Sequence, residues 1–314
     1  MSMDLLNILR NKKLSPTRTG VACTADAFAV ASVRRASGGR FLLQSCLSAA
    51  ATPVEQAEAI ESWLDMEDHR QGPISSVLDP ADYELVYVES PDVLPAEFKA
   101  AVRWRLKGVI DFPLADAVVD VFDKPEPPHR TGAKMIYVVA AKREAIARQT
   151  EMLKSAERRI DVIEIPELAL RNLAALMPEA ADGLILLWLQ EKSAQLIVIK
   201  QSTLYIARQV SLSGRYADGS DADSPDVDAI ALELQRSTDY FESQYQQPPL
   251  TNLIIAPRNE RSAHLAVALE KQTSMRVQSI DLSHALDLSP GLDPSDRCSL
   301  LAIGAALREE PAKL

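Results

Sequence analysis

The chain has 314 residues, of which 47% are hydrophobic and 25% are charged, a composition typical of a globular protein with room for two domains. Its formal net charge of −10 argues against general nucleic-acid binding, which requires a basic surface facing phosphate. Only 11 glycines are present, few for a protein that wraps nucleotide phosphates with its backbone. The sequence also lacks an apolar run of the ~20 residues that a membrane-spanning helix needs.

The first 14 residues combine apolar and basic side chains. They lack the long apolar core and the cleavage site of a secretory signal. Two interpretations stay open. The segment is either an amphipathic foot on an anionic membrane or a terminus that frays or packs on its own domain. The side chains concerned are Leu5, Leu6, Ile8, Leu9, Arg10, Lys12 and Lys13.

Cysteine and histidine give no support for a metal site or for histidine-based catalysis. Cys23, Cys46 and Cys298 are far apart and lie outside any CxxC spacing, so we interpret them as small apolar residues in a reducing compartment. The four histidines show no HExxH or similar pairing. We therefore expect no metal ligands and no catalytic residues of this kind.

The hydrophobic pattern from residue 20 predicts three strands joined by tight turns, at 21–26, 28–35 and 41–48, then a helix at 54–66 and a strand at 74–78. A unit of different character follows. It comprises strands at 85–89, 117–122 and 135–140, helices at 97–110 and 142–158, and a proline-rich loop at 123–132 that we expect to be exposed. A strand at 160–163 and a helix at 167–176 complete the region.

The opening pattern returns in the second part of the chain, with three predicted strands at 183–190, 194–200 and 204–212. Helices at 229–245, 263–271 and 299–307 and strands at 253–255 and 277–280 follow. We predict a first half at 1–180, with an inserted subdomain at about 83–164, and a second half at 181–314. Residues 299–308 form a C-terminal helix that packs back on the first half. A cleft between two such halves is a common ligand site.

The stretch 97–122 is the most informative. Phe98, Val102, Leu106 and Ile110 fall on one helical face, and Pro113 marks the end of the helix. Arg105 interrupts this face and Trp104 lies at its margin. Either Arg105 extends to a rim while Trp104 fills core, or the face is a groove for a polar or peptidic partner. A guanidinium buried on this face without an acceptor would be costly, and both interpretations stay open.

Three segments, Ala101 to Phe122, Leu234 to Tyr245 and Leu300 to Arg308, resemble the PilM/MshI family of actin-like proteins of type IV and MSHA pilus assembly. The resemblance extends from about Thr19 to Arg308 and is greatest to the MshI branch. It implies an α/β fold of the actin-like (FtsA/PilM-like) ATPase type, built from two RNase H-like halves with an α+β subdomain inserted in the first.

The resemblance also implies a role. The protein would be a cytoplasmic adaptor, peripheral to the inner membrane, that grips the short N-terminal tail of a PilN-like inner-membrane protein. The pilus motor ATPase is a second implied partner. In the family the tail lies between the inserted subdomain and the first core subdomain. The corresponding groove residues here are Trp104, Arg105, Asp111, Phe112 and Pro113.

Actin-like nucleotide sites use two turns of Asp-hydrophobic-Gly type and a Gly-Gly turn, because glycine lets the backbone approach phosphate and carboxylates hold the metal ion. The positions that correspond in this chain carry other residues, namely Thr24 and Asp26, Trp188 and Gln190, and Pro257 and Arg258. We therefore predict a pseudo-ATPase that is not an enzyme and uses neither ATP nor Mg²⁺ as a cofactor.

Two alternatives come from the same fold class. A working ATPase or sugar kinase would bind ATP and Mg²⁺, and it predicts an Asp-x-Gly at each of the two turns. A filament-forming scaffold predicts polymers or ordered dimers. The turns at Thr24 and Gln190 disfavour the first alternative, and the sequence does not address the second.

Overall fold

The computed structural model of the protein describes residues 17–36, 39–66, 72–129, 132–153, 158–213 and 224–309. The segment 1–14, for which the sequence leaves a lipid-binding foot and a frayed or packed terminus open, lies outside these ranges. In the ranges described, no helix combines the length and apolarity needed to cross a membrane.

The first sheet has six strands in the order β14-β3-β2-β1-β4-β8. Strands β1, β2 and β3 form an antiparallel meander. Strand β4 pairs parallel to β1, because the chain crosses over through α2. The apolar face of α2, which includes Ile60 and Trp63, packs on the outer side of this sheet. The elements are β1 (Arg18–Cys23), β2 (Ala27–Arg35), β3 (Phe41–Ala50), α2 (Pro53–Leu64), β4 (Ile74–Val77), β8 (Val162–Glu164) and β14 (Asp287–Leu288).

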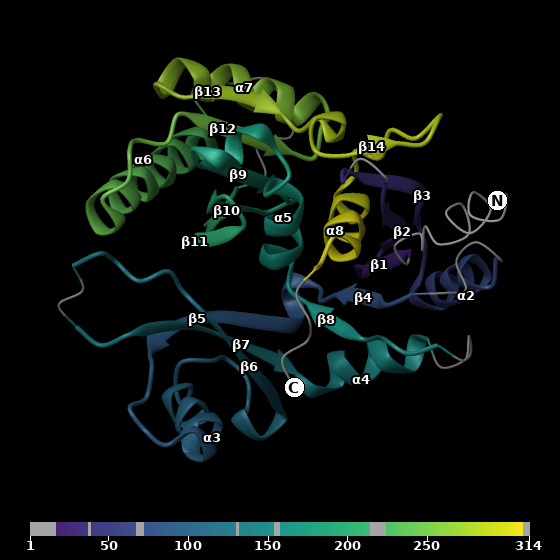
Figure 1. The fold of residues 1–314 in the computed structure, drawn as a ribbon, viewed down its shortest axis with the longest axis horizontal. Helices are drawn as coiled ribbons and strands as arrows, with labels where there is room; N and C mark the ends of the chain where they lie inside the picture. The colour runs from purple at the N-terminus through teal and green to yellow at the C-terminus, as the bar shows by residue number, and fades with distance from the viewer. Residues whose placement is uncertain are drawn as a thin grey trace, which may run out of the picture.

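The second sheet, with the order β11-β10-β9-β12-β13, repeats the arrangement of β3-β2-β1-β4-β8. Its central strand β9 is buried along its whole length, as a continuous apolar run predicts for a strand covered on both faces. Two helices, α6 and α7, cover its outer face (Figure 1). The elements are β9 (Leu184–Leu189), β10 (Ser193–Lys200), β11 (Thr203–Ser211), α6 (Pro225–Tyr245), β12 (Asn252–Ala256), α7 (Glu260–Gln272) and β13 (Arg276–Ser279).

A third sheet of three antiparallel strands, β5-β7-β6, forms the inserted subdomain. Side chains alternate across it, so that Val86 and Val138 pack under α3 while Tyr87 and Tyr137 lie on the other face. Figure 1 shows α3 on the side of this sheet that points away from the rest of the molecule. The elements are β5 (Tyr83–Glu89), α3 (Pro95–Arg105), β6 (Ala117–Asp123), β7 (Met135–Lys142) and α4 (Arg143–Met152).

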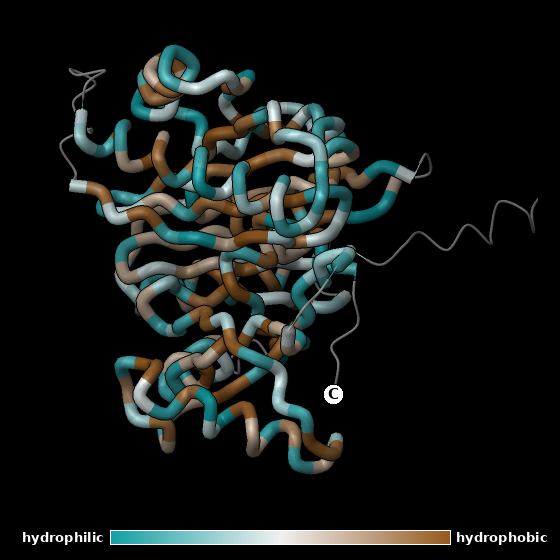
Figure 2. The backbone as a smooth tube through the Cα atoms, turned by 90° about the vertical axis from the view of Figure 1, so that its left-hand side faces the viewer, coloured by the Kyte–Doolittle hydropathy of each residue, from teal (hydrophilic) through white to brown (hydrophobic). Residues whose placement is uncertain are grey.

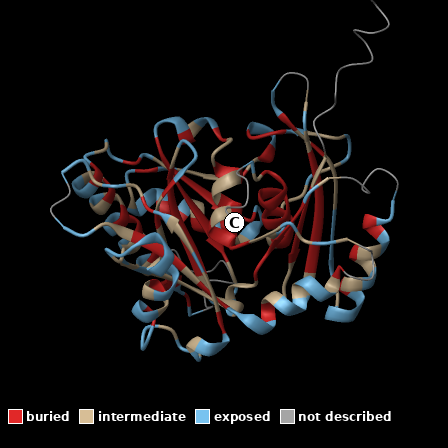
Figure 3. Ribbon diagram, turned by 60° about the horizontal axis from the view of Figure 1, so that its bottom comes forward, coloured by how far each residue is buried: buried red, intermediate tan, exposed pale blue. Residues whose placement is uncertain are grey.

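Two central helices, α5 (Pro166–Ala174) and α8 (Arg297–Ala306), lie between the first and second sheets. They share one buried core with the inward faces of both sheets, and Figure 3 shows this buried centre. Hydrophobic stretches gather in the strands at the middle of the molecule, with hydrophilic loops around them (Figure 2). Short 3₁₀ turns join the elements at Pro80–Asp82, Leu114–Asp116, Pro178–Ala181 and Leu282–His284.

Two expectations from the sequence are corrected. Helix α3 ends at Arg105 rather than at residue 110, because the amide of Leu106 turns back to Arg103 and Gly108 takes a φ of 76°. The proline-rich loop after β6 is not wholly exposed. Lys124, its second residue, is only 7% exposed to solvent, because its side chain lies among tyrosines from distant segments.

Candidate functional site

The surface predicted to bind a peptide lies at the C-terminal end of α3. Trp104 is 69% exposed, with the Lys107 ammonium 5.3 Å from its ring centroid. The side chain of Arg105 is half exposed, and its Nη1 lies 4.0 Å from Glu89 at the end of β5. Of the first interpretation, the placement of Arg105 at a rim is therefore correct, whereas Trp104 does not fill core.

The segment that follows continues this surface. The amide of Asp111 donates a hydrogen bond of 2.7 Å to the Glu84 carboxylate on β5. Phe112 is half-buried against the core under α3, and Pro113 is exposed just before a 3₁₀ turn. The structure thus places Arg105 and the 111–113 segment beside β5, at its two ends, with Trp104 exposed next to Arg105. Phe112 anchors that segment, and its neighbours remain accessible.

A second candidate site lies between the two halves, where the turns predicted to have lost their nucleotide motifs meet. In the β1–β2 turn the Thr24 amide donates to the Ala27 carbonyl at 2.8 Å, and the Thr24 hydroxyl donates to the Asp26 carboxylate at 2.9 Å. Asp26 is exposed, so its carboxylate interacts with the Thr24 hydroxyl and with solvent. This turn presents one carboxylate and no glycine.

In the β9–β10 turn, the residues that correspond to Thr24 and Asp26 lie two positions later than the sequence alone indicated. The Gln190 amide donates to the Ser193 carbonyl at 2.8 Å, the same bond that Thr24 makes in the first turn. Gln190 is therefore the counterpart of Thr24, and Lys192 is the counterpart of Asp26. Trp188, assigned to this turn from sequence, instead lies within β9 with its side chain buried in the shared core. The revised positions still offer neither a carboxylate nor a glycine.

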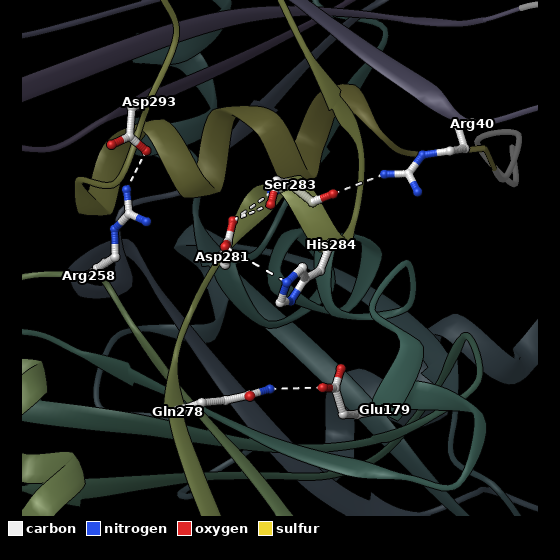
Figure 4. A network of polar contacts seen from close by, with 8 residues as sticks. All are labelled: Arg40, Glu179, Arg258, Gln278, Asp281, Ser283, His284 and Asp293. Carbon is white, nitrogen blue, oxygen red and sulfur yellow. Dashed lines mark hydrogen bonds and ion pairs between the residues drawn. The ribbon is translucent and has the colours of Figure 1, made fainter.

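The third turn follows β12. A cis peptide joins Ala256 to Pro257, and the Arg258 guanidinium forms an ion pair with Asp293. Figure 4 shows these two side chains pointing toward each other. The same figure shows Arg40, which donates to the Ser283 carbonyl at 3.0 Å and so ties the first sheet to the segment after β13.

An open cavity of about 200 Å³ lies where the second and third turns meet the start of α8. Arg261, in the first turn of α7, donates through Nη1 to the Gln190 carbonyl at 2.8 Å. Arg297, the first residue of α8, borders the cavity from the opposite helix. The lining residues are Leu189, Gln190, Glu191, Pro257, Asn259, Arg261 and Arg297.

The chemistry available in this cleft is limited. Burial raises the pKa of the Cys298 thiol to about 11, and Asp296 acts in the same direction, so Cys298 is a thiol rather than a nucleophilic thiolate at neutral pH. Within the described part of the chain, no group of three or more His, Cys, Asp or Glu side chains is placed to hold a metal ion. What the cleft does offer is positive charge.

Sequence reasoning overlooked Arg261 and Arg297. Both lie just inside helix starts that follow the turns of interest, at the second position of α7 and the first of α8. A cation in the first turn of a helix opposes the helix dipole, and this local mismatch was the available signal.

The repeated strand order of the two main sheets, with a three-stranded subdomain inserted beside the first, defines an actin-like fold. No protein-family model matches the chain, and no curated protein sequence does so either.

Among solved structures, the chain is similar to the PilM–PilN type IV pilus biogenesis complex, with a TM-score of 0.65 and 20% identity over 92% of this chain and 97% of that chain. It is also similar to the cytoplasmic domain of EpsL, an inner-membrane component of the type II secretion system of Vibrio cholerae. That match has a TM-score of 0.51 and 16% identity, and it covers 93% of this chain and 96% of the other. At these identities the likeness concerns the fold, which is PilM-like.

Proposed function

We propose that this protein is a cytoplasmic adaptor of a pilus assembly system of the MSHA or type IV class. It holds the short N-terminal tail of a PilN-like inner-membrane protein and is attached to the membrane through that partner. The observation that supports the proposal is the likeness to the PilM–PilN complex over nearly the full length of both chains. The pilus motor ATPase is a second proposed partner.

The inserted subdomain is the proposed holding surface. Its strand β5 is an outer strand of the sheet β5-β7-β6, and extended peptides commonly bind along such edges through main-chain hydrogen bonds. Arg105 and Asp111 both reach glutamates of β5, so α3 and the 111–113 segment border that strand. Exposed tryptophan and arginine are the side chains most enriched at binding hot spots, which favours Trp104 and Arg105 as tail contacts.

We further propose that the adaptor does not hydrolyse ATP. The support is the chemistry of the turns between the halves. Gln190 and Lys192 replace a carboxylate and a glycine, and Pro257 removes a backbone donor from the third turn. The second and third turns therefore lack the carboxylate and the glycines that would hold ATP and Mg²⁺.

The test is a titration of the full chain with a synthetic peptide copied from the N-terminal cytoplasmic tail of a PilN-like inner-membrane protein. Wild type is expected to bind, and Trp104→Ala to weaken binding at least tenfold because a central aromatic contact is lost. Arg105→Ala is expected to weaken it several-fold. Lys99→Ala, an exposed cation on the same helix, is the matched control and should leave the affinity unchanged.

Two results would contradict the proposal. Failure of the wild-type chain to bind the tail would remove the adaptor role. Full affinity in both the Trp104 and Arg105 variants would remove the assigned surface and move the tail elsewhere on the molecule.

A further inference from the structure

The cavity between the β9–β10 turn, the loop after β12 and the start of α8 has a lining that is rich in arginine. We propose that it binds a small oxyanion of about phosphate size, held directly by Arg261 and Arg297 without a metal ion. The inference deepens the proposed loss of ATP chemistry, since it says what the cleft binds instead. It is independent of the tail-binding surface, which lies on the inserted subdomain.

Arg261 has buried donor groups that lack an acceptor in the ranges that the structure describes. Its Nη1 is satisfied by the Gln190 carbonyl, but its Nε and Nη2 are buried with no acceptor among the described residues. A guanidinium stays charged at every physiological pH, and burying such donors unpaired is costly. An oxyanion in the adjacent cavity, met by a small rotation of the Arg261 side chain, supplies both the acceptors and the opposing charge.

Arg297 adds a second positive charge from the other side. It is half-buried, and within the described part of the chain it forms no ion pair. The neighbouring carboxylate of Asp296 is already engaged, because it accepts hydrogen bonds from Ser48 and from the Ser299 amide. Arg297 also stands at the positive end of α8, which raises the potential there further. Its position is unfavourable for the helix and suits an anion.

The lining of the cavity carries the net positive charge that an anion site needs. Two arginines face one carboxylate, Glu191, so the lining is net positive in a chain of net charge −10. A volume of about 200 Å³ accommodates phosphate with a few waters, whereas drug-sized ligands occupy roughly 300–1,000 Å³. Arginine pairs with phosphate in a bidentate geometry, which needs no bridging cation.

The experiment measures binding of inorganic phosphate to the full chain by isothermal titration, in EDTA and at constant ionic strength set with chloride. Wild type is expected to bind phosphate, and Arg297→Gln and Arg261→Gln each to weaken binding at least tenfold. Glu191→Gln should strengthen it several-fold, because the one carboxylate of the lining is removed. Arg258→Gln is the matched control, since Arg258 pairs with Asp293 outside the lining, and its affinity should equal that of wild type.

Parallel titrations with ATP, in EDTA and with Mg²⁺, distinguish the sources of the phosphate group. Equal affinity for phosphate with and without Mg²⁺ supports the proposal. A strict requirement for Mg²⁺, an absence of phosphate binding, or binding unchanged in Arg297→Gln and Arg261→Gln overturns it.

Arg297→Gln has few contacts to lose, so it reports on binding even if Arg261→Gln fails to fold. Tail binding by Arg297→Gln should be unchanged, which separates a failure here from a failure of the adaptor role.

Discussion

At the scale of single residues, two glycines set how closely the central helices approach their neighbours. A Cβ on Gly20 of β1 would lie 1.8 Å from the Ala302 carbonyl oxygen of α8. A Cβ on Gly304 of α8 would lie 2.1 Å from the Ala169 carbonyl oxygen of α5. Both contacts are with backbone, which cannot rotate away as a side chain can. The small residues of the chain's last helix thus let α8 fit between β1 and α5.

The substitution Gly304→Ala is therefore expected to destabilise the protein by about 3 kcal/mol, the upper part of the range for overpacked cores. Urea unfolding followed by circular dichroism measures the change in the free energy of unfolding. Gly132→Ala is the control, because a Cβ there meets nothing within 4 Å, and its effect should stay within about 0.5 kcal/mol. Equal stability of the two variants would mean that α8 shifts without cost.

At the scale of elements, the strands of both meanders could be predicted from sequence because apolar runs bounded by turn residues are a local signal. The end of α3 could not. The apolar pattern continues to Ile110, but Leu106 is buried where the chain turns, and this packing ends the helix at Arg105, well before Pro113. Tertiary contacts overrode a local pattern.

In the candidate sites, too, local features could be predicted from the sequence and features set by tertiary contacts could not. The position of the first turn, at Thr24, could be predicted from the sequence, because that turn follows its strand directly. Counting along a single strand placed the second turn at Trp188, whereas the hydrogen bond from Gln190 to Ser193 shows where the hairpin turns. Arg261 and Arg297 lie 36 residues apart, by their numbering, and only the fold brings both to one cavity.

One buried hydrogen bond joins the start of β5 to α5, within an apolar cluster. The Tyr83 hydroxyl donates to the Glu167 carboxylate at 2.6 Å, and burial raises the pKa of Glu167. Tyr83→Phe leaves that carboxyl without its side-chain donor, so we expect a loss of about 2 kcal/mol in the free energy of unfolding at pH 7. The double variant Tyr83→Phe/Glu167→Gln should recover part of this loss, because the buried group is then neutral. Equal losses in the single and double variants would contradict this account.

At the scale of the whole molecule, a lysine and a group of tyrosines join the inserted sheet to the second half. Lys124 donates to the Tyr87 and Tyr240 hydroxyls, each at 3.0 Å, and its ammonium lies 4.0 Å from the Tyr87 ring centroid. The Tyr137 hydroxyl donates to the Tyr205 carbonyl at 3.3 Å. These contacts link the proposed tail-binding subdomain directly to the second half of the molecule.

This junction predicts a loss of stability at alkaline pH. Tyr245 belongs to the same group, since its ring centroid lies 5.6 Å from the Lys124 ammonium. Burial raises the pKa of Tyr87, Tyr137 and Tyr245 above the ordinary tyrosine value of about 10. The unfolded chain releases these protons from about pH 10 while the folded chain keeps them, so their contribution is intact below pH 10 and is lost as the pH rises further. Burial lowers the pKa of Lys124, which has the opposite effect below about pH 10.5. The clean window for tyrosine therefore begins near pH 10.5.

Tyr245→Phe separates the tyrosine contribution from general alkaline unfolding. The Tyr245 hydroxyl is buried with no hydrogen-bond partner among the described residues, so its removal should leave stability at pH 8 unchanged or raise it by up to about 1 kcal/mol. Between pH 10.5 and 11.5 the variant should lose stability less steeply than wild type, by about 1.4 kcal/mol per pH unit, because one proton fewer is linked to unfolding. Urea unfolding at each pH measures both quantities. Parallel curves for wild type and variant would show that Tyr245 ionises equally in the folded and unfolded chains, and Tyr245 would then have no part in the alkaline loss.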